Sequence, residues 1–253
     1  MSSLISLLKK EIKELNILLI VSTLIIAVWE WFLITRTEQW PQGLSFGFGF
    51  IPLFFLPLIM IFLAYTSYRN EWGNNTIYLL KILPRRGYEI NLAKFLPAFF
   101  YYLLISLALI LVNIYFNQDL IAQLLNKTPG MIGHQVSRQI FILTYIAYLI
   151  TGIQIYLVTQ FSYIIATFFN RLRILISIWI FILSQYLIMR IGAFVNYLFG
   201  WLPNFPLTLY MESTAGVTEN VVYLGSAPFV SILLLMTALF FLNSRLIAAE
   251  VDV

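Results

Sequence analysis

Few residues in this chain of 253 have side chains suited to bond-making chemistry. The chain has one histidine and no cysteine, so disulfides, thiol nucleophiles and thiolate metal sites are excluded. Residues 43–47 read GLSFG and match the G-x-S-x-G pattern of serine nucleophiles. That chemistry needs a histidine base within hydrogen-bond reach of Ser45, whereas His134 is expected in an outer loop before the fourth apolar segment. An intramembrane protease is therefore kept only as an alternative function for this chain. A non-transporting scaffold or sensor is a further alternative.

The acidic residues give no metal-site pattern either. The 11 Asp and Glu residues are scattered, and no H-E-x-x-H motif is present. We therefore expect no metal ligand, no catalytic residue and no cofactor bound by this chain.

Composition indicates an integral membrane protein. The chain is 61% hydrophobic and 10% charged, whereas soluble domains carry roughly 25% charged residues. A spanning helix needs about 20 mainly apolar residues. Six segments qualify, at residues 17–34, 46–67, 95–116, 139–167, 174–192 and 227–243. These segments are continuously apolar rather than alternating, which excludes a β-barrel. We expect an all-α membrane protein with one domain over residues 1–253.

The basic residues predict an orientation. They form no basic stripe of the kind that binds nucleic acid, despite the net charge of +4. Cytoplasmic loops carry an excess of Lys and Arg. With the N-terminus inside, the inner segments hold Lys9, Lys10, Lys13, Arg69, Lys81, Arg85, Arg86, Lys94, Arg171, Arg173 and Arg245. The outer side holds only Arg36, Lys127, Arg138 and Arg190. Both termini are therefore predicted to be cytoplasmic, in a plasma (bacterial inner) membrane.

Two segments flank the spans without crossing the membrane. In residues 1–15, five apolar residues share one helical face: Leu4, Leu7, Leu8, Ile12 and Leu15. Lysines and the residues Glu11 and Glu14 occupy the remainder, which predicts an amphipathic helix in the interface beside lipid headgroups. Residues 193–226 are aromatic and broken by prolines, so we expect short helices or a re-entrant element at the outer face.

Prolines and ionisable residues mark the spans themselves. Pro57 and Pro97 remove backbone hydrogen bonds, so neighbouring helices must satisfy the freed carbonyls. Glu30 and Arg190 lie near the outer ends of the first and fifth spans. Ionisable residues at such positions pair with each other or reach the headgroups, and the alternative is a direct role in binding an ion or the substrate.

Hydroxyl residues form a stripe along the fourth span. Its members recur every three or four residues: Thr144, Tyr148, Thr151, Tyr156, Thr159 and Tyr163. Such a face packs and hydrogen-bonds against other helices, including those of a second copy. The alternative is that it lines a pathway for an amphipathic substrate.

The segment between the second and third spans is polar, basic and longer than a connection requires. It begins YRNEWGNNTIYLLKILPRRGYE at Tyr68. Asn74 or Asn75 could cap a short helix that ends at Pro84. Four residues share one face of that helix: Trp72, Thr76, Leu79 and Leu83. The pattern favours a docking element for a cytoplasmic partner.

Here the sequence resembles the membrane subunits of type 2 ATP-binding-cassette exporters. The resemblance rests on Glu71, Gly73, Thr76, Leu79, Leu80, Pro84, Arg85, Arg86 and Lys94. It implies an N-terminal elbow helix at residues 1–15, six spans, and a cytoplasmic coupling segment at residues 68–93. The implied coupling residues are Glu71, Trp72, Gly73, Thr76, Leu79, Leu80, Leu83, Pro84, Arg85 and Arg86.

The resemblance also implies partners. The chain has no G-x-x-x-x-G-K-[ST] phosphate loop, so ATP and Mg would bind to separate ATPase subunits. A second copy or a homologous permease would complete the membrane part. The expected cargo is hydrophobic or amphipathic, either a peptide or a lipid-like molecule, and moves outward.

Overall fold

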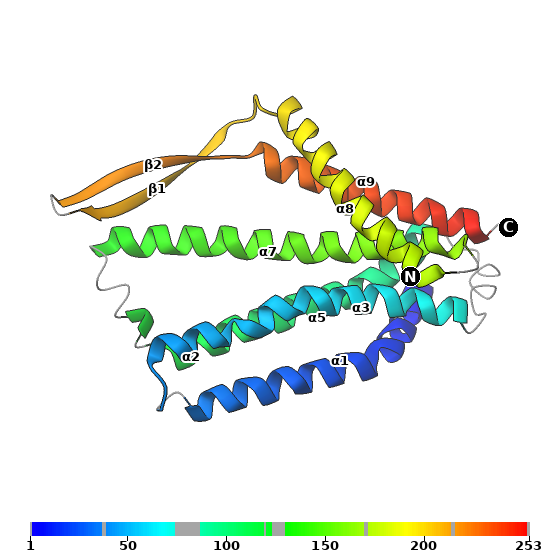
Figure 1. Ribbon diagram of the computed structural model, residues 1–253, viewed down its shortest axis with the longest axis horizontal. Coiled ribbons are helices and arrows are strands. Elements are labelled where there is room, and N and C mark those ends of the chain that lie inside the picture. The colour runs from blue at the N-terminus through cyan, green and yellow to red at the C-terminus, as the bar shows by residue number, and fades with distance from the viewer. Residues whose placement is uncertain are drawn as a thin grey trace.

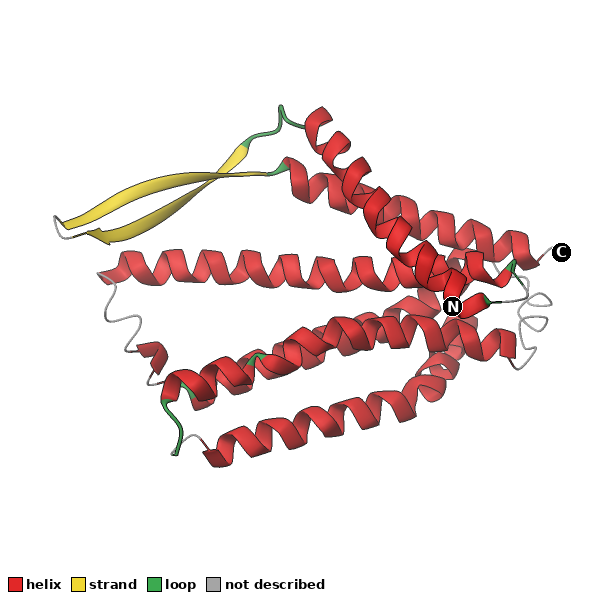
Figure 2. Cartoon of the chain, viewed as in Figure 1, coloured by secondary structure: helices red, strands yellow, loops and turns green. Residues whose placement is uncertain are grey.

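The computed structural model describes residues 2–36, 39–73, 87–118, 120–122, 130–169, 172–213 and 216–251. Its helices and strands are shown in Figures 1 and 2. They are α1 (Ser2–Arg36), α2 (Gln42–Gly49), α3 (Ile51–Gly73), α5 (Gly87–Phe116), α7 (Gly130–Thr167), α8 (Arg173–Leu198), β1 (Asn204–Ser213), β2 (Gly216–Gly225) and α9 (Ala227–Val251).

Six helical segments among the described residues are long and apolar enough to cross a membrane. They are Ile5–Arg36, Gly43–Glu71, Gly87–Phe116, Ile140–Thr167, Arg173–Leu198 and Ala227–Ala248. The prediction of six spans is confirmed. The second span contains both α2 and α3, which are separated by Phe50. Most helices run past the predicted ends, because helical geometry continues into the polar residues that flank each apolar run.

The helices form a bundle with both described chain ends on the same side. In Figure 1, the axes of α1, α3, α5 and α7 lie roughly parallel, and α8 crosses α7 at an angle next to α9. The start of α1 and the end of α9 lie at one end of the bundle, and the strands project from the other. An even number of spans requires this arrangement of the termini.

The interior of the bundle is formed mainly by α3, α5 and α7. Leu56, Met60, Tyr102 and Tyr156 are fully buried and belong to one apolar core. Large apolar side chains cover the outside as well, and Phe54 is 79% exposed. Such a surface would be unfavourable in water, but it is what hydrocarbon requires of a protein that satisfies its backbone hydrogen bonds internally.

The predicted interfacial helix is the beginning of α1, which continues directly into the first span. The start of α1 turns away from the direction of the rest of the helix (Figure 1). Glu11, expected outside the apolar face, is instead buried together with Leu7 and Leu15, whereas Ile12 is half exposed. That part of the prediction was wrong because Glu11 has a buried cationic partner, described below.

The segment at residues 193–226 contains a β-hairpin rather than short helices or a re-entrant element. The helix α8 continues through the first residues of this segment to Leu198. The strands β1 and β2 then pair in antiparallel register from Asn204 opposite Gly225 to Ser213 opposite Gly216. The second strand reads GVTENVVYLG, and its Val and Thr residues favour extended structure. The prediction weighed the aromatic residues and prolines and missed this pattern.

Candidate functional site

A buried lysine holds two carboxylates at the end of the bundle that carries the termini. The Nζ atom of Lys94, in α5, lies 2.6 Å from Oε1 of Glu11 in α1 and 3.2 Å from Oε1 of Glu71 in α3. It also donates to the backbone carbonyl of Ser67 at 3.0 Å. The three charged side chains are 1–3% exposed. One ammonium group therefore joins the ends of three helices.

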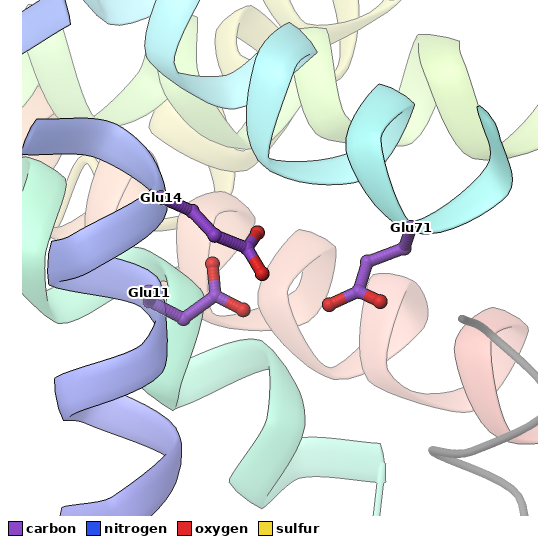
Figure 3. A group of neighbouring side chains, drawn as sticks. All are labelled: Glu11, Glu14 and Glu71. Atoms are coloured by element: carbon purple, nitrogen blue, oxygen red, sulfur yellow. The ribbon is translucent and has the colours of Figure 1, made fainter. Parts of the chain in front are cut away.

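A second lysine completes this ion cluster, which comprises Lys10, Glu11, Glu14, Glu71 and Lys94. Lys10 Nζ lies 2.7 Å from Glu71 and 3.5 Å from Glu14. Figure 3 shows the three glutamates approaching each other from α1 and α3, and an oxygen of each lies within 4.8 Å of the others. Two ammonium groups already contact these carboxylates, so the charges of the cluster are compensated largely by the protein itself.

A layer of amides adjoins the ion cluster. This amide cluster comprises Tyr68, Asn91, Gln160, Asn243 and Ser244, all at most 5% exposed. Gln160 Nε2 donates to the hydroxyl of Tyr68 and to Oδ1 of Asn91. Asn91 Nδ2 donates to Ser244 Oγ at 3.0 Å, and Asn243 Nδ2 donates to Gln160 Oε1 at 3.2 Å. The amide cluster thereby connects α3, α5, α7 and α9.

The two clusters form one polar network through shared helices. The Tyr156 hydroxyl of α7 donates to the backbone carbonyl of Lys94 at 3.0 Å, and Ser67 donates to Glu11 at 3.0 Å. Unpaired polar groups are expensive in an apolar environment, whereas satisfied networks fix one arrangement. Moving one of α1, α3, α5, α7 or α9 at this end would therefore break hydrogen bonds to the others.

The network lies at both ends of the predicted coupling segment. Glu71 is two residues before Gly73, where α3 ends, and Lys94 is seven residues after Gly87, where α5 begins. Residues 74–86 lie outside the described residues, so seven predicted coupling residues have no structural account: Thr76, Leu79, Leu80, Leu83, Pro84, Arg85 and Arg86.

The remaining predicted coupling residues end α3. The backbone of Trp72 and Gly73 forms its last turn. Glu71, expected at the contact with an ATPase subunit, is buried within the chain and bonded to Lys10 and Lys94. Its carboxylate therefore positions helices rather than facing a partner.

The stripe on α7 mainly joins this helix to its neighbours. The Tyr148 hydroxyl donates to the backbone carbonyl of Leu53 at 2.8 Å. Pro57, four residues after Leu53, has no N–H to bond that carbonyl, so the expectation that a neighbouring helix satisfies it is confirmed. The ring of Tyr148 stacks on Tyr102 with centroids 5.2 Å apart. A Cβ atom on Gly152 would collide with the Tyr102 ring, which explains the glycine at this close contact.

The other stripe residues divide between packing and a cavity. Tyr156 and Tyr163 are buried inside the chain, so these tyrosines are not a surface for a second copy. Thr151 and Thr159 donate to carbonyls of their own helix. Thr144 lines an apolar cavity of about 470 Å³ between α3, α5 and α7. The packing alternative holds for most of the stripe, although Thr144 and Tyr148 border this cavity and Thr159 borders a second one.

Glu30 and Arg190 do not meet. Among the described residues no salt bridge joins them. Glu30 is half buried in α1 and lines a small cavity with Asn113 of α5 and with Asn117, which directly follows α5. Arg190 donates to the hydroxyl of Tyr186 on its own helix at 3.0 Å. The predicted charge pair between Glu30 and Arg190 is therefore absent among the described residues.

The serine and the histidine of the protease alternative, Ser45 and His134, lie in different helices. Ser45 is buried in α2, and its hydroxyl lies 3.3 Å from Oδ1 of Asn117, to which it donates. His134 lies within α7 rather than in a loop, because that helix begins at Gly130. Ser45 thus hydrogen-bonds to an amide, which cannot serve as its base.

Several network residues were not identified as a site from the sequence. Asn91, Gln160 and Asn243 are separated by many residues, and only the fold brings them together. Gln160 and Asn243 gave a signal, because an amide inside an apolar span is costly unless it has partners, whereas Asn91 precedes the predicted third span. Glu11 gave no such signal, because acidic residues are ordinary in an amphipathic helix at the interface.

Six candidate spans among the described residues, five of them joined by a polar network at one end, define a multi-pass membrane protein. Residues 7–182 match the model of a family described as ABC-2 family transporter protein, and this range is more than half of the chain. The chain belongs to that family, which confirms the resemblance to type 2 permease subunits. It is thus a membrane subunit of an ABC transporter. Comparisons with curated proteins and with solved structures give no match.

Proposed function

We propose that this chain couples ATP hydrolysis on separate nucleotide-binding subunits to outward movement of a hydrophobic or amphipathic substrate. Membership of the ABC-2 family supports a partnership with ABC ATPase subunits. The observation that carries the proposal is the position of Glu71 and Lys94, which flank residues 74–86 on α3 and α5 and contact each other. The complex contains two membrane chains, identical or similar, and two ATPase chains.

The polar network gives this proposal a mechanical route. Closure of the ATPase subunits displaces residues 74–86, and the displacement reaches the end of α3 and the start of α5. The ion pair between Glu71 and Lys94 makes these two ends move together. The bond from Lys94 to Glu11 extends the movement to α1, and the amide cluster extends it to α7 and α9.

The proposed cargo follows from the chemistry of the bundle. The cavity of about 470 Å³ between α3, α5 and α7 is lined by Phe50, Phe54, Ile110 and other apolar side chains. Mostly apolar cavities of this size accept apolar ligands. A peptide with an apolar face or a lipid-like molecule fits this description.

The experiment uses the chain co-expressed with a candidate ABC ATPase subunit from the same genome. After reconstitution in liposomes, the wild-type chain should change the ATPase rate of its partner severalfold. Glu71→Gln keeps the shape of the side chain and removes its charge, so we expect co-purification to persist and the effect on ATPase rate to disappear. The matched control is Glu14→Gln, because Glu14 is partly exposed at the rim of the same cluster.

Two results would contradict the proposal. If the chain never co-purifies with an ATPase subunit, the proposed coupling has no basis. Wild-type coupling in the Glu71→Gln complex would show that the ion cluster does not transmit the movement.

A further inference from the structure

A second cavity lies between α3, α7 and α8, toward the end of the bundle that carries the termini. It has a volume of about 370 Å³ and is lined by Ile61, Phe62, Ser177, Ile178 and neighbouring residues. Phe62 and Ile178 are 60% and 56% exposed, so the cavity opens sideways into the region occupied by lipid. A ligand could enter from the membrane without passing through the bundle.

The walls of this cavity are apolar in spite of their hydroxyl groups. Thr159 and Ser162 line it, but each donates its hydroxyl to a backbone carbonyl of α7, at 2.8 and 2.7 Å. Their hydrogen atoms are thus directed to the helix and not to the cavity. The interior suits a hydrocarbon chain better than a polar molecule.

Two arginines lie at one end of the cavity. The guanidinium of Arg69 is 5.8 Å from the ring centre of Tyr65, which lines the cavity. Tyr65 contacts the ring of Tyr163 at 5.2 Å, and Arg173 hydrogen-bonds to the Tyr163 side chain. Arg173 also precedes Ile174, another lining residue. Both guanidinium groups therefore contact one aromatic pair, of which Tyr65 lines the cavity.

These arginines have no acidic partner within the described residues. The salt bridges of this region join Glu11, Glu14 and Glu71 to lysines. Arginine binds phosphate through paired hydrogen bonds, and basic pockets between spanning helices bind anionic lipid headgroups. Charge and shape thus favour the same ligand, with an anionic head and an apolar tail.

We propose that this cavity binds an anionic phospholipid, with one acyl chain between α3, α7 and α8 and the phosphate at Arg69 and Arg173. The loose packing of α8 against the rest of the chain supports a lipid as the ligand. Ser184 is the one residue of α8 that is buried within the described chain. A bound lipid would fill the space between α8 and α3 and tie the start of α8 to the end of α3. This site is independent of the transported cargo and of the coupling route.

The test measures lipid binding to the full-length protein by native mass spectrometry. Phosphatidylglycerol and phosphatidylcholine with identical chains are titrated in detergent, and the wild-type protein should bind phosphatidylglycerol more tightly. A surface arginine near anionic lipid contributes roughly fivefold in affinity, so the double variant R69Q/R173Q should bind phosphatidylglycerol about thirtyfold more weakly. Binding of phosphatidylcholine should not change.

The chain offers a matched control. Arg190 also lies over a tyrosine ring, that of Tyr186 at 5.2 Å, but near the opposite end of α8. R190Q should retain wild-type preference for phosphatidylglycerol. Equal binding of the two lipids by the wild-type protein, or an unchanged preference in R69Q/R173Q, would overturn the proposal.

Two further measurements test the acyl-chain part. Ser177→Trp fills the cavity and should weaken phosphatidylglycerol binding, whereas unchanged binding would mean that only the headgroup is held. Phosphatidylglycerol with a photoreactive diazirine on its chain should label the wild-type protein on α3, α7 and α8 around the cavity. Labelling elsewhere, or crosslinks between two protein chains through this opening, would contradict a lipid site. The labelling uses the unaltered protein, so it does not depend on the folding of a variant.

Discussion

Lys94 shows how a single charge can organise the end of a membrane bundle. Its ammonium contacts two carboxylates from two other helices, and all three side chains are removed from solvent. Removing one partner of a buried ion pair is strongly destabilising, because the remaining charge has no compensation. Without Lys94, Glu11 would lose its ammonium partner and Glu71 would keep only Lys10.

Lys94→Ala should therefore lower the free energy of unfolding by about 3–5 kcal/mol. The measurement is thermal or denaturant unfolding of the purified protein in detergent. Lys13→Ala is the control, because Lys13 is exposed on α1 and its loss should change stability little. Equal stability of the two variants would show that the buried lysine is not needed to compensate Glu11 and Glu71.

At the scale of elements, the contact between α3 and α7 compensates a defect in a helix. Pro57 leaves the carbonyl of Leu53 without its normal donor, and the Tyr148 hydroxyl of α7 supplies a replacement at 2.8 Å. The same tyrosine stacks on Tyr102 of α5. One side chain therefore links three helices through a hydrogen bond and a ring contact.

Tyr148→Phe should lower stability by about 1–3 kcal/mol, because it leaves the Leu53 carbonyl unsatisfied. In a Pro57→Ala background the new N–H can bond to that carbonyl, so the cost of Tyr148→Phe should become smaller. The four unfolding free energies form a double-mutant cycle with a measurable interaction term. Additive effects would show that the hydrogen bond and the proline are unrelated.

For the whole molecule, the arrangement of six spans places the hairpin and the termini at opposite ends (Figure 1). The distribution of Lys and Arg predicts that the termini are cytoplasmic. The hairpin would then project from the outer face of the membrane, and the end of α7 and the start of α8 would lie on the cytoplasmic side.

The absence of cysteine provides a clean background for testing this orientation. Phe205→Cys places a thiol on β1, and Phe169→Cys places one after α7; both native side chains are at least half exposed. A membrane-impermeant maleimide should label the first in intact cells and the second only after lysis. The reverse pattern would contradict the predicted orientation, and labelling of both from one side would contradict the fold.

The sequence was sufficient for the spans but not for the network. Each span is a local run of apolar residues, and its length alone meets the requirement of the bilayer. The polar network depends on contacts between residues as distant as Glu11 and Lys94, or Asn91 and Ser244, and no local pattern pairs them. The hairpin was missed for another reason, since extended structure outside the membrane depends on weak propensities that the aromatic residues obscured.

The chain order of the amide cluster has a consequence for biogenesis. Asn91 and Gln160 enter the membrane with α5 and α7, but Ser244 and Asn243 arrive only with α9, which is synthesised after them. Until then, two buried amides lack some of the partners that offset the cost of placing them there. The network at this end of the bundle can therefore be completed only once α9 has been synthesised, and a chain truncated before α9 would present quality-control proteases with an unfinished membrane domain.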